Sequence, residues 1–132
     1  MNKPIINFIR YNIEEYIYKK IELTDSADDE KNTSPEDNFS IGVTPAITPD
    51  FKHGKITISI HYDLAPHNIK LSVNGFFELN DEYSEDELEK ALVVNGTAII
   101  FPYIRSMISM LSSLDSEEAI ILPTINTNNL LN

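Results

Sequence analysis

Alternating apolar and polar residues predict strands in the first two thirds of the chain. The clearest alternation spans residues 55–64, where every second side chain is apolar: Ile56, Ile58, Ile60, Tyr62 and Leu64. A period of two buries one face of a strand and leaves the other in water, which is typical of an antiparallel sheet. Similar runs over residues 8–21, 39–44 and 69–79 predict three more strands. Gly75 suggests a β-bulge in the last strand, and Pro66-His67-Asn68 predicts the turn before it.

After residue 80 the apolar period becomes helical. Ser84 and Glu87 have the spacing of a capping box, and Leu88, Ala91 and Leu92 follow on one helix face. Asn95-Gly96 predicts a break, and Phe101-Pro102 predicts the start of a second helix, with proline at its first position. A short stub is expected over residues 126–131. The sequence thus predicts an α+β fold, with a four-stranded antiparallel sheet and a long broken helix packed on one face.

Length and composition exclude several classes of protein. A chain of 132 residues, 42% hydrophobic, is expected to form a single domain over residues 1–132 with a core of its own. The absence of cysteine excludes disulfides, thiolate zinc sites and thiol nucleophiles. A membrane-spanning helix needs about 20 apolar residues, and no apolar run approaches that length, so no membrane insertion is expected. The N-terminus does not resemble a signal peptide, which predicts a cytoplasmic protein.

The charge pattern is strongly acidic. The formal net charge is −11, and the acids gather mainly at residues 22–37, 78–89 and 115–118. Such a chain repels nucleic acid and attracts basic partners, although an acidic surface also simply keeps a protein soluble. The segment 22–37 is rich in Ser, Thr and Asn and lacks an apolar period, so we interpret it as a mobile acidic loop.

None of the candidate chemical sites is complete. The acid pairs lie in dense, exposed clusters, where nothing separates their pKa values. Of the histidines, only His61 shares a strand face with another ligand, Asp63, and no further ligand joins them. Ser106 lacks a nucleophile elbow, and the glycines are too scattered for a phosphate loop. We therefore expect neither an enzyme nor a cofactor nor a metal.

The last third of the chain carries a family resemblance. Residues 101–105 read Phe-Pro-Tyr-Ile-Arg and open a serine-rich amphipathic helix, and Pro123 and Asn126 follow about twenty residues later. This pattern, after four strands that end at Gly75-Phe76-Phe77, resembles the SecB family of protein-export chaperones. The final helix is shorter than in that family, the polar C-terminal tail is missing, and the insert at 22–37 is longer.

The resemblance implies candidate binding residues. An apolar client surface is expected between the sheet and the loop that follows the main helix, and acids on the sheet are expected to dock a transfer partner. The client-binding candidates are Phe76, Phe77, Phe101, Tyr103, Ile120, Ile121, Leu122 and Ile125. The docking acids are Glu78, Asp81 and Glu82. For Phe77 and Phe101 core packing is the alternative, whereas Phe76 falls on the wet face of its strand.

The resulting functional hypothesis is an ATP-independent holdase that binds unfolded or precursor polypeptides for export and passes them to the Sec translocation motor. Apolar excess on the main helix also predicts a homo-oligomer, either a dimer or a tetramer. Two alternatives stay open. One is a SecB-like chaperone dedicated to a single client, such as an antitoxin. The other is an acidic adaptor or nucleic-acid mimic without chaperone activity.

Overall fold

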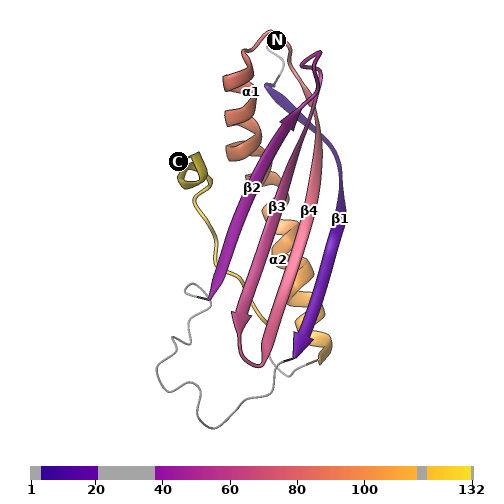
Figure 1. Ribbon diagram of the computed structural model, residues 1–132, viewed down its shortest axis with the longest axis vertical. Coiled ribbons are helices and arrows are strands. Elements are labelled where there is room, and N and C mark those ends of the chain that lie inside the picture. The colour runs from indigo at the N-terminus through magenta and orange to yellow at the C-terminus, as the bar shows by residue number, and fades with distance from the viewer. Residues whose placement is uncertain (1–3, 21–37, 116–118, 132) are drawn as a thin grey trace.

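A computed structural model describes residues 4–20, 38–115 and 119–131. Its strands form one antiparallel sheet in the order β1-β4-β3-β2 (Figure 1). Their bounds are β1 (Ile6–Lys20), β2 (Phe39–Ile47), β3 (His53–Leu64) and β4 (His67–Leu79). All four strands lie where the alternation predicts them. The expected turn at 66–68 is shorter, because β4 already begins at His67 and only Ala65 and Pro66 lie between the two strands.

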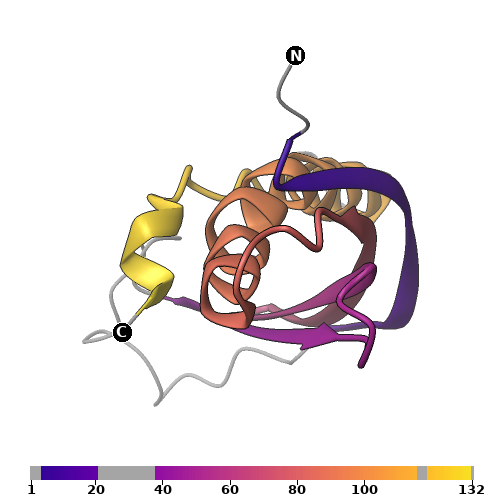
Figure 2. The same cartoon turned by 90° about the horizontal axis from the view of Figure 1, so that it is seen from above.

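Helices cover one face of this sheet, as Figure 2 shows from above. The helical run begins with α1 (Glu85–Ala91), continues through a π-helical turn, η2 (Leu92–Gly96), and ends with α2 (Thr97–Asp115). A short 3₁₀ helix, η3 (Thr127–Leu131), follows the loop. The capping box is present: the Glu87 backbone N–H donates to Ser84 Oγ at 3.2 Å, and the Ser84 backbone N–H donates to Glu87 Oε2 at 3.1 Å. The α+β architecture, with a four-stranded antiparallel sheet and one long helical run on its face, is confirmed.

The break in the helix differs from the sequence expectation. Asn95 and Gly96 belong to the π-helical turn η2, which joins α1 to α2 without a loop. Pro102 therefore lies inside α2 and does not begin it. Proline in a helix leaves the carbonyl four residues earlier without its donor. Here that residue, Ala98, is exposed, so water can replace the missing bond.

Gly75 has a different role from the predicted bulge. β4 pairs with β3 in unbroken register through Gly75, and the shifts in register lie in β1, at Phe8/Arg10 and Ile13/Glu15. A Cβ at Gly75 would lie 2.7 Å from Cγ1 of Ile100 in α2. Glycine is therefore required because α2 packs closely against the sheet at this point.

The core lies between the sheet and the helical run. Its largest fully buried side chains come from β3, β4, the helices and the loop: Phe77, Ile56, Ile58, Ile69, Leu71, Leu88, Leu92, Ile100, Ile104, Ile108, Leu122 and Val73. Inward and outward residues alternate along β3, so the face that carries Thr57 and Ser59 is left for solvent. That alternation gives the sheet one apolar and one polar side.

The helical run Glu85–Asp115 is long and apolar enough to cross a membrane, with a mean hydropathy of 1.4 in an 18-residue window. A segment of this kind was not expected from the sequence. Half of that window is buried, as in the core helix of a folded domain. The acidic segment 22–37 lies outside the described residues, and so do residues 116–118 of the third acidic cluster.

Candidate functional site

The predicted binding residues divide into core and surface positions. Phe77 and Leu122 are fully buried, and Phe101 and Ile120 are 4% and 8% exposed. These four side chains belong to the core and are not accessible to a ligand on the folded chain. By contrast, Tyr103 and Ile121 are exposed, at 42% and 67%. Phe76 and Ile125 are half-buried.

A groove runs between α2 and the segment that follows it. We call it the α2 groove; its volume is about 650 Å³. Its lining consists of Pro102, Arg105, Ser106, Ser109, Met110, Ser113, Ile121 and Leu122. Serines at 106, 109 and 113 recur at helical spacing, and their small side chains leave the hollow open. Met110 and Ile121 are each 67% exposed and supply its apolar surface.

Two hydrogen bonds position the groove's outer wall. The Nε of Arg105 donates to the carbonyl oxygen of Leu122 at 3.0 Å, and the backbone N–H of Ile120 donates to Ser112 Oγ at 2.8 Å. With the buried side chains of Ile120 and Leu122, these bonds hold the segment beside α2. Ile121 lies between those two residues and points outward. Ile120 and Leu122 therefore support the groove, while Ile121 forms its surface.

A second apolar surface lies where α2 meets β1. We call it the α2–β1 stripe; it consists of Tyr11, Ile13, Ile99 and Tyr103, each between 37% and 48% exposed. The rings of Tyr11 and Tyr103 are 4.9 Å apart between centroids. β1 is an edge strand, so no other described strand pairs with its outer backbone groups. An apolar stripe beside an open strand edge is suited to binding another polypeptide.

Sequence reasoning missed most of this stripe. It named only Tyr103, because Tyr11 and Ile13 lie in a strand where apolar residues occur on both faces and no alternation separates them. The apolar excess along α2 was the available signal. On that helix, Met110 and Leu114 are 67% and 79% exposed.

Phe76 and the loop at residues 120–125 do not form one surface. Phe77 points into the core under α2, so its neighbour Phe76 points to the opposite side of the sheet. The loop lies on the helical side, because Leu122 belongs to the same core. The single client surface expected between them is therefore absent from the described part of one chain.

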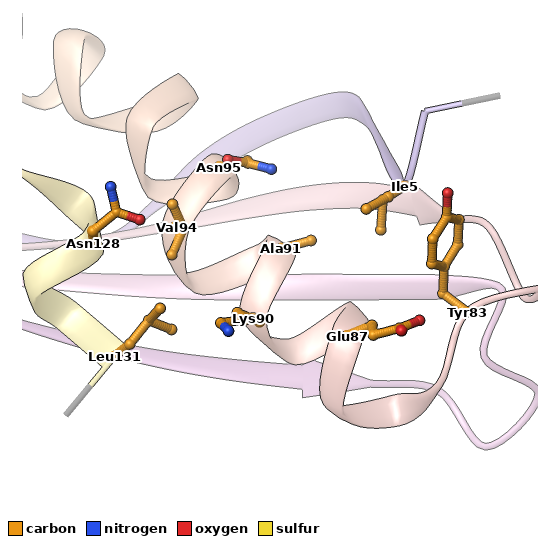
Figure 3. A pocket seen from close by; sticks show the side chains of 9 residues that line it. All are labelled: Ile5, Tyr83, Glu87, Lys90, Ala91, Val94, Asn95, Asn128 and Leu131. Carbon is orange, nitrogen blue, oxygen red and sulfur yellow. The ribbon is translucent and has the colours of Figure 1, made fainter. Parts of the chain in front are cut away.

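A second hollow, of about 360 Å³, lies between the first helical turns and the C-terminal 3₁₀ helix (Figure 3). Ala91 and Val94 line it from the helical run, Leu131 from η3, and Ile5 and Tyr83 close the far end. Glu87, Lys90, Asn95 and Asn128 give it a polar rim. It is a mixed pocket of a size that accepts a large side chain or a small ligand.

The docking acids lie at the end of the sheet near α1. Glu78, Asp81 and Glu82 are exposed, and the first turn of α1 adds Glu85, Asp86 and Glu87. Among the described residues, no three His, Asp or Glu side chains gather into a possible metal site. The described surface therefore offers apolar grooves and charged rims.

Polar contacts tie the opposite end of β1 to α2. Lys20 Nζ lies 2.8 Å from Asp115 Oδ2, and the Tyr18 hydroxyl lies 3.1 Å from the same oxygen. The hydrogen bond from Lys20 holds the pKa of Asp115 below its usual range. The Tyr16 hydroxyl donates to the Met107 carbonyl at 2.9 Å, and burial, aided by nearby Tyr18, raises the pKa of Tyr16 to about 12.

Tyr16 predicts a loss of stability at alkaline pH. Its folded pKa of about 12 lies above the unfolded value of about 10, so its contribution is complete below pH 10 and falls as the pH rises towards 12. Tyr16→Phe should lose less stability than the parent between pH 9 and pH 11, measured as the urea midpoint. Tyr11→Phe, which changes an exposed ring, is the matched control. Equal alkaline slopes for all three proteins would contradict this assignment.

Comparison with solved structures identifies proteins that share this fold. No family model matches the chain. Its architecture matches the Mycobacterium tuberculosis Rv1957 SecB-like chaperone, solved in complex with a ChAD peptide from the Rv1956 HigA1 antitoxin. That match has a TM-score of 0.65 and 14% identity, and it covers 91% of this chain and 90% of the other. A protein of unknown function from Streptococcus agalactiae matches with a TM-score of 0.59 and 12% identity, covering 90% and 97%.

A curated relative is nearer in sequence. The uncharacterized protein MJ0357 of Methanocaldococcus jannaschii is 31% identical over 124 residues, which cover 84% of this chain and 76% of that protein. The structural matches confirm the resemblance stated from the sequence, as far as the fold is concerned. The chain therefore has a SecB-like fold and belongs to the family of the uncharacterized protein MJ0357.

Proposed function

We propose that this protein is an ATP-independent chaperone that holds extended segments of non-native polypeptides on the helical side of its sheet. The observation that carries the proposal is the α2 groove, together with the adjoining α2–β1 stripe. Both expose apolar side chains that the fold of one chain leaves uncovered. Apolar contact is non-directional, and methionine adapts to many shapes, so such a surface accepts many sequences. The peptide in the SecB-like chaperone of M. tuberculosis supports the same use of this fold.

We also propose that the chain is a cytoplasmic homo-oligomer, a dimer or a tetramer. Exposed apolar side chains on α2 and the open edge of β1 support self-association. The exposed side chains of α2 are not needed to cover the sheet of one chain, and the open edge can pair with a strand of a second copy. In this proposal Glu78, Asp81 and Glu82 form an acidic surface that binds a basic partner, such as the Sec motor, when the client is transferred to it. Their exposure at one end of the sheet supports that role.

The test is suppression of aggregation. The double variant Met110→Ser/Ile121→Ser removes the apolar surface of the α2 groove at two exposed positions. It should bind a chemically unfolded reporter protein about tenfold more weakly than the parent, while its melting temperature stays the same. Ile17→Ser, on the outer face of β1 opposite Lys70, is the matched control and should bind like the parent. Light scattering with and without the reporter gives the mass of the oligomer and of its complex.

The outcomes separate the alternatives. Equal binding by the parent, the double variant and the control would place the client elsewhere. A parent that slows the aggregation of no unfolded protein would exclude the chaperone and favour the acidic adaptor. The antitoxin peptide in the M. tuberculosis structure specifically favours a second candidate, a chaperone dedicated to one client. Protection of one partner protein, with none for several unrelated reporters, would identify that case.

A further inference from the structure

The outer face of the sheet holds an aromatic side chain between two cations. Phe76 of β4 points away from the helices, and its register neighbours are Arg10 in β1 and Lys55 in β3. The guanidinium carbon of Arg10 lies 4.4 Å from the centre of the Phe76 ring, a cation–π contact. This contact orients the Arg10 side chain across the ring. Phe76 is therefore a half-buried apolar anchor with a positive charge on each side.

A hollow of about 310 Å³ opens beside this anchor. Ala46 and Phe76 supply apolar side chains to its lining, and Ile47, Thr48, His53, Gly54 and Lys55 complete it. The side chain of Ile47 itself packs against the core. The volume is that of a binding pocket for a single large side chain. We call the hollow and the flanking Arg10 the Phe76 hollow. It lies across the sheet from the α2 groove and shares no residue with it.

Within residues 4–20, 38–115 and 119–131, the cations of the Phe76 hollow form no ion pair with a carboxylate. Among the described residues, an ion pair joins Lys20 to Asp115 near the opposite end of β1, whereas neither Arg10 nor Lys55 lies within 4.0 Å of a described carboxylate. Two acids lie nearby: Glu78 is two residues further along β4, and Asp50 accepts a hydrogen bond at 2.7 Å from Thr48, which lines the hollow. On the other side, the next row of the sheet is neutral: Asn12, Asn74 and Thr57 are linked by hydrogen bonds of 3.2 and 2.6 Å. In a chain with a net charge of −11, two cations that pair with no described carboxylate lie beside an apolar hollow and can bind an external anion.

We propose that the Phe76 hollow docks an extended acidic segment of a partner polypeptide, with an apolar residue of that segment in the hollow and its carboxylates on Arg10 and Lys55. A peptide fits better than a nucleic acid for two reasons. A phosphate backbone requires a track of cations, whereas here the neighbouring row is neutral. The net charge of −11 repels a polyanion at long range far more than it repels a short segment that contacts two cations directly. This site is separate from the proposed client surface.

The test uses labelled synthetic peptides and fluorescence anisotropy with the full-length protein. The first peptide is a 10-residue segment with a central phenylalanine between glutamates, and the second replaces each glutamate by glutamine. The acidic peptide should bind about tenfold more tightly than its amide counterpart at low salt, and the difference should shrink as salt is added. Phe76→Ala and the double variant Arg10→Gln/Lys55→Gln should each weaken the acidic peptide by about tenfold, and Lys55→Gln alone should weaken it by about threefold.

Lys70→Gln is the matched control. Lys70 lies on the same face of β4, about 20 Å along the strand from Phe76, and its replacement removes one charge just as Lys55→Gln does. It should leave peptide binding unchanged. Equal losses for Lys70→Gln and Lys55→Gln would overturn the proposal, because binding would then follow overall charge. Tighter binding of a labelled 10-nucleotide oligothymidine than of the acidic peptide would also overturn it, in favour of a nucleic-acid surface.

Discussion

Phe101→Ala is expected to lower the free energy of unfolding by about 3 to 5 kcal/mol. Phe101 is 4% exposed and lies on the buried face of α2, in the core between the helical run and the sheet. Its replacement removes buried apolar area and leaves a cavity that close-packed neighbours cannot fill. Because domains of this size are stable by only about 5 to 15 kcal/mol, the variant should be near its folding limit.

Phe76→Ala is the matched comparison for Phe101→Ala. It removes the same ring from the outer face, where the ring is half-buried and makes a cation–π contact with Arg10. The expected cost is about 1 kcal/mol. Urea titrations at one protein concentration would measure both, since self-association makes apparent stability depend on concentration. Similar costs for the two variants would show that Phe76 is part of the core and would remove it as an anchor.

Gly75→Ala is expected to destabilise the protein by about 1 to 3 kcal/mol, although it adds only one methyl group. The new Cβ would lie 2.7 Å from Cγ1 and 2.8 Å from Cδ1 of Ile100, well inside van der Waals contact. Ile100 is fully buried and cannot swing into solvent. Either α2 moves away from β4 or the side chain leaves its preferred rotamer, and both cost packing energy.

Gly42→Ala provides the control for Gly75→Ala. Gly42 lies on the edge strand β2, where an added Cβ has no heavy atom within 4 Å. That substitution should be neutral or stabilise by about 0.4 to 1 kcal/mol through the unfolded chain. The clash can also be tested by coupling: Gly75→Ala should cost less in an Ile100→Ala background than in the parent. Equal costs in the two backgrounds would show that Ile100 is not the obstacle.

The local signals in the sequence identified most of the fold. Period-two alternation predicted the four strands, and the capping box at Ser84 predicted the start of the helical run, because each depends on neighbouring residues alone. The same alternation placed Phe76 on the outer face. Where the prediction was wrong, long-range packing overrode a local signal. Asn95-Gly96 normally ends a helix, yet the helical run continues through a π-helical turn.

The candidate site was less predictable. The apolar loop at residues 120–125 was identified as unusual, but the sequence does not show which of its residues point inward. The hydrogen bonds from Arg105 to Leu122 and from Ile120 to Ser112 decide this, and of the apolar residues in the loop they leave Ile121 exposed. Tyr11 joins the surface only because β1 lies beside α2, and its ring contacts Tyr103, 92 positions further along the chain.

The sequence by itself therefore determined the class of fold, the positions of the strands, the polar outer face of the sheet and the surplus of apolar residues on the main helix. Those properties follow from backbone periodicity and from the chemistry of adjacent residues. Only the tertiary structure decided which apolar residues are core and which are surface, why Gly75 must be glycine, and that Phe76 lies across the sheet from the α2 groove. These features depend on how α2 packs on β4 and β1. Such contacts join segments that are distant in the sequence, so no local sequence pattern predicts them.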